Sequence, residues 1–419
     1  MKAKIIDFKP IEIVSVKYCR HDEMIKMGRL ALNNRKIYFE YDAEFLKNKL
    51  ELSPFKLALR SGIIACEDNV FEGLFGIFND SLPDGWGRLL LDRKLIQMGI
   101  NPANITPLDR LCYVGNRGMG ALTYEPEIFN FENTHSLKDL DLIADECVNF
   151  QENDNDKFID DLLFMNGSSA GARPKILISI TKNKTLENTE SDPQKTHDNW
   201  IIKFRSNSDP IDIGAIEYAY HLMAQEAGLL VPEAKLFKSK KCSGYFGVKR
   251  FDRQKSSFQH MHTIAGLLHT DHRVPILDYE ILLKATMHLT KDIRECEKQF
   301  RHMVFNIFAH NRDDHSKNFS FLMDRNGKWQ VSPAYDLTFS AGPMGQHCTT
   351  ILGEGKNPTI ENILKLAEAI SIKKKIALEI IDEVKNAVSK WEKFAEIAMV
   401  SKRSSKNIMS ILNARNQKC

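Results

Sequence analysis

Residues 309–340, AHNRDDHSKNFSFLMDRNGKWQVSPAYDLTFS, contain the feature that most constrains the fold of this chain. Asp313 and Asn318 are five positions apart, and Asp336 follows a predicted hairpin with its turn at residues 324–327. In kinase catalytic loops an Asp accepts the proton of the attacking hydroxyl, an Asn five residues later binds magnesium, and a later Asp joins the metal to the phosphates. Mg²⁺ prefers oxygen ligands of these types. The spacing therefore predicts a phosphoryl-transfer loop.

The same residues have a simpler interpretation as an exposed polar turn followed by an ordinary strand end. An Asp and an Asn at this spacing are weak evidence when taken alone. Asn311 also stands where protein kinases usually place His. The choice between the two interpretations depends on the rest of the chain.

Composition indicates an ordinary globular protein. The chain has 419 residues, of which 43% are hydrophobic and 27% charged, enough for about two or three cores. A net charge of +3 provides no concentrated positive charge for direct DNA binding. The eight cysteines are scattered without a CxxC pair, so neither a zinc site nor a disulfide framework is expected. No apolar stretch reaches the roughly eighteen residues of a membrane span, and we expect a cytoplasmic protein without a membrane partner.

Residues 1–126 are predicted to form a small mixed domain. Residues 11–18 and 35–42 alternate apolar and polar side chains, as half-buried strands do. A Pro-Asp-Gly turn at residues 83–85 opens a helix that ends at Gly99. The face predicted to be apolar in this helix consists of Leu89, Leu90, Arg93, Leu95 and Ile96.

Asp84, Trp86 and Arg88, at the start of that helix, have two interpretations. In one they form a ligand site, and in the other they form a capped turn packed under Trp86. We favour the capped turn. The glycine-rich turn at residues 115–120 is also interpreted as structural, because no Lys-Ser/Thr pair follows it.

Three further segments complete the predicted organisation. The acidic segment 127–160 is interpreted as a linker or solvated helix between domains. Residues 161–255 are predicted to form a region like a kinase N-lobe, with a phosphate loop. Residues 256–419 are predicted to form a helical lobe that carries the catalytic loop and the metal-binding Asp, because helical periodicity dominates residues 276–310 and 359–413.

A run of small residues at 167–172 precedes the apolar strand KILISI. Small residues let backbone N–H groups approach phosphate oxygens closely, and Arg173 and Lys175 add positive charge. The GK[ST] ending of a Walker A loop is absent, so a plain hairpin turn is the alternative. The position just before a strand favours a phosphate loop.

Lys203 lies in a β-rich run, and Glu217 follows in the first turn of a helix predicted from residue 214 to Gly228. A strand Lys usually faces solvent, and an acid near a helix start usually interacts with the helix dipole. In a kinase, the same two residues form an ion pair in which the lysine reaches the phosphates. The order of small-residue loop, strand Lys, helix Glu, catalytic loop and metal Asp favours the kinase interpretation.

A third strand, residues 243–253, is predicted to end at a hinge between two lobes. There Lys249, Arg250 and Phe251 are expected to line an adenine ring, with Asp252 near the ribose. For Phe251, plain core packing is the alternative.

Several of these motifs resemble one known family. GSSAGARPK, IIKF, EYAYHLMAQEAGL, VKRFDR, NRDDHSKNFSF and SPAYDL resemble the HipA-type serine/threonine kinases of bacterial toxin-antitoxin modules. SLPDGWGRLLLDR and RGMGALTY resemble the N-terminal domain attached to that kinase, and the resemblance runs from about residue 25 to 370. It implies an α+β, two-lobed, protein-kinase-like fold with a mostly helical C-terminal lobe and a small N-terminal subdomain.

The resemblance also implies cofactors and partners. ATP and Mg²⁺ are the expected cosubstrates. The expected partners are a helix-turn-helix antitoxin (HipB-like), which carries most of the DNA recognition, and a protein substrate involved in translation, usually an aminoacyl-tRNA synthetase.

Carried over residue by residue, Asp313 corresponds to the catalytic base and Asn318 and Asp336 to the metal ligands. The implied nucleotide-binding residues are Ala170, Gly171, Ala172, Arg173, Pro174, Lys175, Lys203, Glu217, Lys249, Arg250, Phe251, His315, Ser316, Lys317, Asn318, Tyr335 and Asp336. Ser168 or Ser169 corresponds to a loop serine that such kinases autophosphorylate, which ejects the loop. Adding negative charge there disfavours phosphate binding in the same loop.

The chain departs from the family at two places and leaves two functional alternatives. Lys249 stands where some members have Glu, and Arg173 and Pro174 replace their Gln and Glu. A small-molecule phosphotransferase is one alternative, since antibiotic phosphotransferases use a similar Asp-to-Asn loop. The other is a catalytically idle relative that binds its antitoxin and co-represses an operon.

Overall fold

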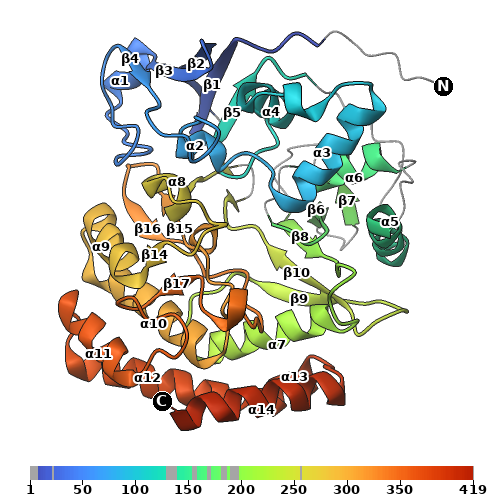
Figure 1. Ribbon diagram of the computed structural model, residues 1–419, viewed down its shortest axis with the longest axis vertical. Helices are drawn as coiled ribbons and strands as arrows, with labels where there is room; N and C mark the ends of the chain where they lie inside the picture. Colours follow the sequence, from blue (N-terminus) through green and yellow to red (C-terminus); the bar gives the residue numbers. More distant parts are fainter. Residues whose placement is uncertain are drawn as a thin grey trace.

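The computed structural model describes residues 8–20, 23–128, 139–152, 158–167, 171–180, 186–188, 198–254 and 257–418. Ser168, Ser169 and Ala170 therefore lie outside the described residues. Within the described part, two five-stranded sheets and a helical region follow one another along the long axis of the molecule (Figure 1). No helix among these residues is long and apolar enough to cross a bilayer.

The N-terminal sheet is antiparallel throughout and has the strand order β4-β3-β2-β1-β5. Its strands and the helices beside it are β1 (Ile13–Arg20), β2 (Glu23–Asn33), β3 (Lys36–Tyr41), α1 (Ala43–Lys47), β4 (Ile63–Ala65), α2 (Gly76–Asn79), α3 (Gly85–Gln97), α4 (Pro107–Val114) and β5 (Leu122–Glu125). Alternation along β1 buries Val14, Val16 and Tyr18 on one face, as the sequence pattern predicts.

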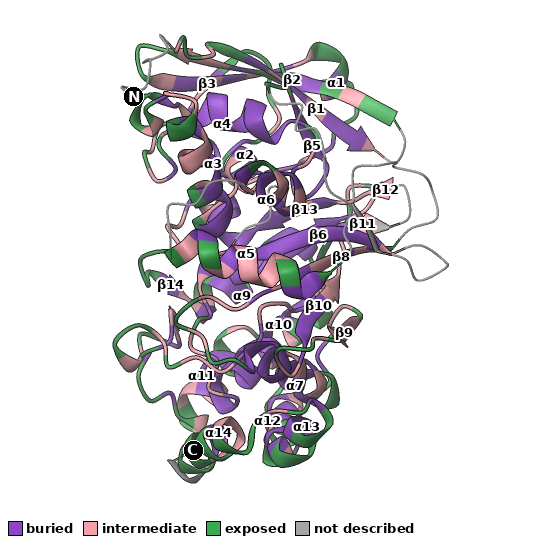
Figure 2. Cartoon of the chain, turned by 90° about the vertical axis from the view of Figure 1, so that its right-hand side faces the viewer, coloured by how far each residue is buried: buried purple, intermediate pink, exposed green. Residues whose placement is uncertain are grey.

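The middle sheet is also antiparallel, with the order β7-β6-β8-β10-β9. The elements of this region are α5 (Leu140–Glu152), α6 (Ile159–Asn166), β6 (Lys175–Ile180), β7 (Leu186–Asn188), β8 (Asp198–Lys203), α7 (Ile213–Glu226), β9 (Ala234–Phe237), β10 (Tyr245–Lys249), β11 (Arg253–Gln254) and β12 (Ser257–Phe258). Figure 2 shows its central strands buried. Lys175 and Lys203 are direct cross-strand partners, so two ammonium groups start from neighbouring backbone positions.

The C-terminal region is mostly helical. Its elements are β13 (His260–Thr263), α8 (Ile264–Leu268), β14 (Leu277–Asp278), α9 (Tyr279–Thr290), α10 (Ile293–Phe308), β15 (Ser320–Met323), β16 (Trp329–Val331), β17 (Thr349–Thr350), α11 (Ile360–Ala369), α12 (Lys374–Ser389), α13 (Trp391–Ile397) and α14 (Lys402–Lys418). Short 3₁₀ turns lie at Pro102–Asn104, Ser316–Asn318 and Pro343–Gly345. The expected α+β fold with a largely helical C-terminal lobe is confirmed.

The hydrophobic cores cross the boundaries predicted from the sequence. Trp86 and Leu90 of α3 share one core with Phe150 of α5 and with Ile176 and Ile202 of the middle sheet. Trp86 contacts Phe150 edge to face, with ring centroids 5.4 Å apart. The helix α3 thus belongs to the N-terminal segment by sequence and to the middle sheet by packing.

This packing corrects the face predicted for α3. Leu89 and Ile96, expected on the apolar face, are exposed by 38% and 60%. Leu91 and Trp86 are buried instead, together with Leu90 and Leu95. The prediction was wrong because the helix is covered by α6 and the middle sheet, which bury the side adjacent to the one that spacing alone suggested.

Candidate active site

The predicted catalytic loop begins where α10 ends. Asn311 is buried, its backbone N–H donates to the Asn306 carbonyl at 2.9 Å, and its side-chain amide donates to the Asn306 Oδ1 at 2.9 Å. Asn311 also forms a parallel bridge with Ser340. The residue that stands in place of the usual kinase His therefore anchors the loop to the helix before it.

The side chain of Asn318 closes this loop over Asp313. Its Nδ2 donates to the Asp313 carbonyl at 2.8 Å, which orients the amide oxygen away from that contact. The Asp313 carboxylate is open to solvent, yet desolvation by the surrounding protein raises its pKa, with His315 opposing and Asp336 adding to the shift. His315 Nε2 lies 4.0 Å from Asp313 Oδ1.

Asp336 lies at the centre of the charged groups. Its backbone is left-handed, with φ of 55°, and its carboxylate forms an ion pair with Lys203. Burial alone raises the pKa of Asp336, but Lys203 and Lys175 outweigh burial and hold it well below the ordinary range. The carboxylate therefore stays ionised at neutral pH.

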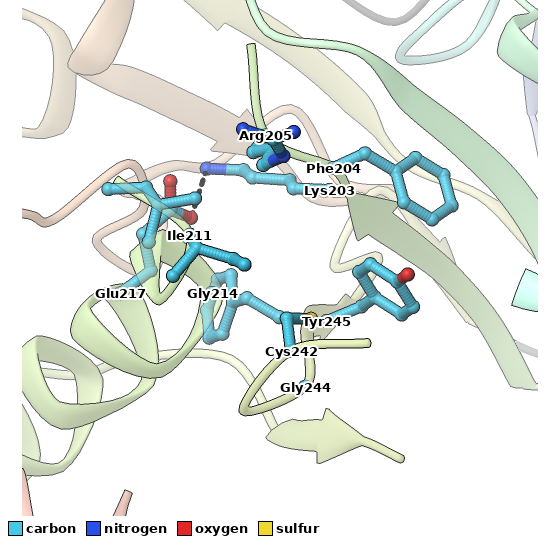
Figure 3. A pocket seen from close by; sticks show the side chains of 11 residues that line it. Lys203, Phe204, Arg205, Ile211, Gly214, Glu217, Cys242, Gly244 and Tyr245 are labelled. Atoms are coloured by element: carbon cyan, nitrogen blue, oxygen red, sulfur yellow. Dashed lines mark ion pairs between the residues drawn. The ribbon is translucent and has the colours of Figure 1, made fainter. Parts of the chain in front are cut away.

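The expected pair between Lys203 and Glu217 is present. Lys203 Nζ lies 3.1 Å from Glu217 Oε2, and the two side chains are 11% and 4% exposed. The Phe246 ring lies 5.7 Å from the same ammonium. An open pocket adjoins the pair, with Ile211 and Tyr245 among its lining residues (Figure 3). Lys203 thus faces α7 and the cleft rather than solvent.

Lys175 closes the same group from β6. It is buried, and a Cβ placed on Gly171 would collide with its Nζ, so this ammonium lies directly over the glycine. Burial lowers the pKa of Lys175 to about 8; Asp336 opposes this shift, whereas Lys203 adds to it. Lys175 and Lys203 therefore face the same small volume.

The contacts of Asp84 differ from those predicted from the sequence. Its carboxylate accepts a hydrogen bond from the Gly171 backbone N–H and a second from Lys317 Nζ at 2.7 Å. The Trp86 backbone N–H donates to the Gly171 carbonyl at 3.1 Å, so the start of α3 holds Gly171 on both sides. Burial raises the pKa of Asp84, but Lys317 and the Gly171 N–H outweigh it and lower the pKa to about 2.

These contacts correct the expectation of a capped turn. The helix α3 does begin after Asp84, but the Asp84 side chain makes no hydrogen bond to the helix N-terminus. It contacts the phosphate loop and the catalytic loop instead. The proximity of Asp84 to Lys317 could not be seen from the sequence, because 233 residues separate them.

A second missed residue is Asp314, beside the predicted base. Its buried carboxylate accepts hydrogen bonds from Tyr279 Oη at 2.7 Å and from the Cys348 N–H at 2.8 Å, and its Oδ2 lies 2.9 Å from His347 Nδ1. Asp314 therefore joins the catalytic loop to α9 and to the segment before β17. The only indication in the sequence was the Asp-Asp pair itself.

The remaining catalytic-loop residues face inward. His315 Nδ1 and Ser316 Oγ are buried and have no hydrogen-bond partner within the described structure. Tyr335 donates from its hydroxyl to the Lys317 carbonyl at 2.6 Å. The unpaired atoms beside Asp313 are polar groups that a bound ligand could satisfy.

The predicted hinge residues divide into two groups. Phe251 lies against Tyr335, the residue before the predicted metal ligand Asp336, with ring centroids 5.6 Å apart. Lys249 pairs with Asp198 at 2.7 Å, and Arg250 pairs with Asp252 at 2.7 Å. Their contact with an adenine ring stays a prediction.

The burial of Asp252 contradicts the expectation that this residue lies near the ribose. It is fully buried and also accepts hydrogen bonds from the Gly120 N–H at 2.9 Å and from Arg253 at 2.8 Å. Its position joins the glycine-rich turn of the N-terminal region to the end of β10. The residue is structural.

The donor atoms of the site fit magnesium. With its amide nitrogen bound to the Asp313 carbonyl, Asn318 offers its oxygen, and Asp336 offers a carboxylate held in its ionised form. One amide oxygen and one carboxylate, with phosphates and water, are ligands that Mg²⁺ accepts. These two residues could hold the ion.

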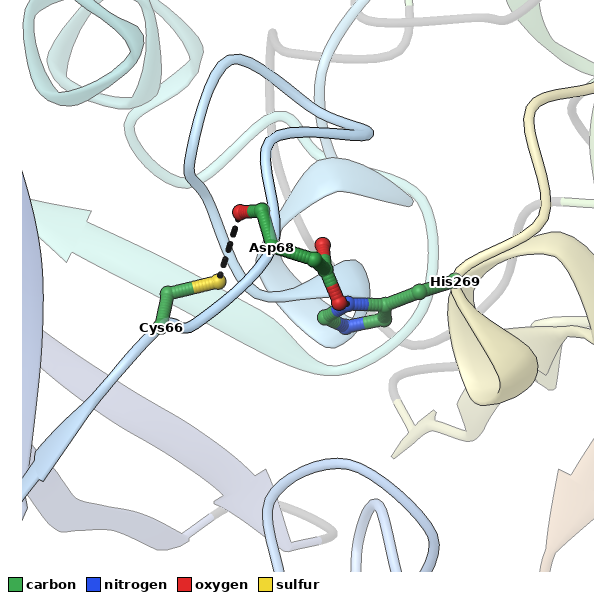
Figure 4. A group of neighbouring side chains, drawn as sticks. All are labelled: Cys66, Asp68 and His269. Carbon is green, nitrogen blue, oxygen red and sulfur yellow. Dashed lines mark hydrogen bonds and ion pairs between the residues drawn. The ribbon is translucent and has the colours of Figure 1, made fainter.

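A different cluster has the composition of a metal site but not its chemistry. Cys66, Asp68 and His269 offer ligand atoms within 4.8 Å of one another (Figure 4). Gly76 N–H donates to His269 Nε2 at 2.9 Å, so the proton of the neutral ring is on Nδ1, which lies 2.7 Å from Asp68 Oδ2. Both ring nitrogens are used, and burial lowers the pKa of His269. The cluster fastens α8 to the loop after β4.

Comparisons with known proteins agree with this architecture. A family model described as the HipA-like C-terminal domain matches residues 167–391, and one described as the HipA N-terminal domain matches residues 22–125. In the complex of HipA, HipB and operator DNA from the toxin-antitoxin system of Shewanella oneidensis MR-1, one chain is similar to this one with a TM-score of 0.66 and 15% identity, over 96% of this chain and 95% of that one.

The proinflammatory kinase CtkA of Helicobacter pylori has a TM-score of 0.41 and 14% identity, over 59% of this chain and 89% of that one. Because the C-terminal family model alone spans more than half of the residues and the N-terminal model matches most of the remaining N-terminal segment, the chain belongs to the HipA family.

Proposed function

We propose that this protein is an ATP- and Mg²⁺-dependent serine/threonine protein kinase that acts in the cytoplasm as the toxin of a type II toxin-antitoxin module. The observation that carries the proposal is the convergence of Lys203, Glu217 and Asp336 with the loop of Asp313 and Asn318, where the charge of Asp336 acts on Asp313. These residue types, in this chain order, are the parts that phosphoryl transfer by protein kinases requires.

In the proposed mechanism Lys203, oriented by Glu217, binds the α and β phosphates, and Lys175 and Lys317 add positive charge at the same cleft. Bound Mg²⁺ would neutralise charge on the phosphates. Asn318 and Asp336 would hold the ion. Asp313 would accept the proton of a serine or threonine hydroxyl as its oxygen bonds to the γ-phosphorus, while the bond from that phosphorus to the β–γ bridging oxygen breaks and ADP leaves. The solvent-open carboxylate of Asp313 is accessible to a protein side chain.

The family supports the proposed partners. The similar chain from Shewanella oneidensis belongs to a complex of HipA, HipB and operator DNA. By analogy, a HipB-like helix-turn-helix antitoxin would bind this chain and carry most of the contacts to DNA. The proposed substrate is a translation component of the aminoacyl-tRNA synthetase class. Ser168 or Ser169 is the proposed autophosphorylation site, close in sequence to Gly171, whose N–H is bound by Asp84.

The test is phosphate transfer from labelled ATP in the presence of Mg²⁺, with and without cell lysate. The wild type should label itself and one lysate protein, whereas Asp313→Asn and Asp336→Ala should label neither. Intact mass of Ser168→Ala and Ser169→Ala variants then identifies the modified serine. Full transfer by Asp313→Asn would contradict the assigned base.

Two other outcomes of this experiment would favour the two alternative functions. Label found only on an added small molecule indicates a small-molecule phosphotransferase with the same loop. An unmodified wild type that binds no nucleotide, but binds its antitoxin, indicates an idle co-repressor. The complete set of charged residues in the cleft favours the kinase over the idle relative.

A further inference from the structure

Arg173 occupies the junction between the phosphate loop and β6. The carbonyl of the next residue, Pro174, accepts a hydrogen bond from the Phe204 N–H at 2.8 Å, so the chain is fixed to β8 immediately after Arg173. Arg173 is therefore the last loop residue before a rigid strand. A side-chain contact at this position limits how far the described loop residues, 171–173, can move.

Two of the guanidinium nitrogens bind Asp209. Arg173 Nε donates to Asp209 Oδ2 at 2.9 Å, and a terminal nitrogen donates to Oδ1 at 3.0 Å. The Ser206 N–H and hydroxyl also donate to Asp209, at 2.9 and 2.7 Å. Bidentate pairs of this kind fix both distance and orientation. Asp209, which is 10% exposed, is thus held in place by the turn after β8 and presents both oxygens to Arg173.

The third nitrogen binds Glu217. Arg173 Nη1 lies 3.0 Å from Glu217 Oε1, while Lys203 Nζ lies 3.1 Å from Glu217 Oε2. One carboxylate, only 4% exposed, therefore joins the end of the phosphate loop to the lysine that is proposed to bind phosphate. Displacement of the loop removes one of the two cations paired with Glu217.

We propose that Arg173 is a positioning residue: Asp209 fixes its guanidinium, and its direct contact with Glu217 joins the described end of the phosphate loop, residues 171–173, to the Lys203–Glu217 pair. This inference rests on the proposed kinase function and gives Arg173 a role different from direct binding of phosphate. Three of the five guanidinium N–H groups are already bound to protein carboxylates. An anchored loop binds nucleotide without first losing the conformational entropy of a free one.

The experiment is calorimetric titration of the full chain with Mg·ADP, together with steady-state kinetics in ATP. The variants are Arg173→Ala, Arg173→Lys, Asp209→Asn and the double variant Arg173→Ala/Asp209→Asn. Arg29→Ala is the matched control, because Arg29 pairs with Glu40 at 2.7 Å on the N-terminal sheet. Each variant is accepted only if its thermal transition shows a folded protein.

Arg173→Ala should weaken Mg·ADP binding by about 10- to 100-fold, the worth of a lost charge-assisted hydrogen bond. Asp209→Asn should weaken binding in the same direction, and the double variant should be no weaker than Arg173→Ala, since the two residues act as one unit. Arg173→Lys, which keeps the charge but not the bidentate geometry, should restore part of the loss. The KM for ATP should rise while kcat stays near the wild-type value.

Three results overturn the inference. Wild-type affinity in Arg173→Ala shows that the loop needs no anchor. A loss in Arg173→Ala together with wild-type affinity in Asp209→Asn shows that Arg173 contacts the nucleotide directly. If Arg173→Ala does not fold, Asp209→Asn alone decides, and wild-type affinity there overturns the inference. If the wild type itself binds no Mg·ADP, the proposed function fails together with the inference. In the other three results the wild type binds Mg·ADP and only the role of Arg173 is overturned.

Discussion

The carboxylate of Asp84 and the ammonium of Lys317 form an ion pair of 2.7 Å across 233 residues of sequence. Asp84 precedes α3 in the N-terminal region, and Lys317 lies in the 3₁₀ turn of the catalytic loop. The side chains are 18% and 10% exposed, so the pair is largely removed from water. It links the N-terminal region to the residues proposed to perform chemistry.

Replacement of Asp84 alone should destabilise the protein more than replacement of both Asp84 and Lys317. Asp84→Ala leaves a buried ammonium and the Gly171 N–H without their acceptor and should cost about 3 kcal/mol of unfolding free energy. The double variant Asp84→Ala/Lys317→Met should lose less unfolding free energy than Asp84→Ala, because no buried charge is left unpaired. Urea denaturation measures both. Lys47→Ala, which breaks an exposed pair with Glu44, is the control, and an equal loss in the control would contradict the burial argument.

Replacement of Gly85 should disturb the phosphate loop, whereas a similar glycine elsewhere should not matter to it. Gly85 has φ of 42°, and a Cβ there would lie 2.7 Å from the Ala172 Cα. Gly85→Ala should therefore shift the loop and weaken Mg·ADP binding. Gly62→Ala is the matched control, because Gly62 also has positive φ, at 86°, but has no atom within 4 Å of the added Cβ. Equal nucleotide affinity in the two variants would show that the close approach is unimportant.

Asp336→Asn and Asp336→Ala should both abolish phosphate transfer but differ in stability. Each removes the negative charge next to Lys203 and Lys175. The backbone at this position is left-handed, which Asn tolerates better than Ala by roughly 1 kcal/mol. Chemical denaturation should therefore show the Ala variant to be the less stable of the two. A more stable Ala variant would contradict the backbone argument.

Loss of the Asp314 carboxylate should loosen the segment beside the active site. Asp314→Ala removes the acceptor of the Cys348 N–H and of the Tyr279 hydroxyl, and leaving such buried groups unpaired costs about 1 to 3 kcal/mol each. Tyr279→Phe, which deletes one donor while retaining the carboxylate, should cost less. Hydrogen exchange of residues 347–349 should accelerate in Asp314→Ala. Unchanged exchange there would show that the segment is held by other contacts.

Buried histidines should make the protein acid-sensitive, and His302 is one of several whose pKa burial lowers. Burial lowers the pKa of His302 from 6.5 to about 4, with Asp314 opposing the shift. Between these values the unfolded chain binds a proton on this ring that the folded chain does not, so stability falls as pH drops from 6.5 towards 4. Protonation of this histidine in the unfolded chain should lower the free energy of unfolding by an amount on the order of 3 kcal/mol. Denaturation midpoints across this range should depend less on pH in His302→Gln, and His288→Gln controls for removal of a histidine on the surface.

Local patterns predicted the parts of the site that local sequence determines. The spacing of Asp313 and Asn318 sets a loop closed by their own hydrogen bond, and periodicity placed Lys203 on a strand and Glu217 on a helix. The structure brings Lys203, Glu217 and Asp336 together, in agreement with the expected order.

The contacts that were missed depend on which distant elements meet. Asp84 looked like a helix cap because it lies in the Pro-Asp-Gly turn that opens α3, but its partners are Gly171 and Lys317. Asp252 looked like a hinge residue but is enclosed by arginines and the turn at Gly120. The exposed face of α3 was misjudged for the same reason, since spacing shows a periodicity but not which surface covers it.

The core shared by α3 and the middle sheet restricts how this gene can be divided and recombined. A fragment that begins after residue 126 would lack Trp86 and Leu90, and it would leave Phe150, Ile176 and Ile202 without the helix that covers them. If residues 1–126 and 127–419 were expressed as separate fragments, each would expose its half of this core and should be prone to aggregate. The fragments should recover the shared core only by binding each other. In descent, a substitution on one side of this core should favour a compensating substitution on the other side.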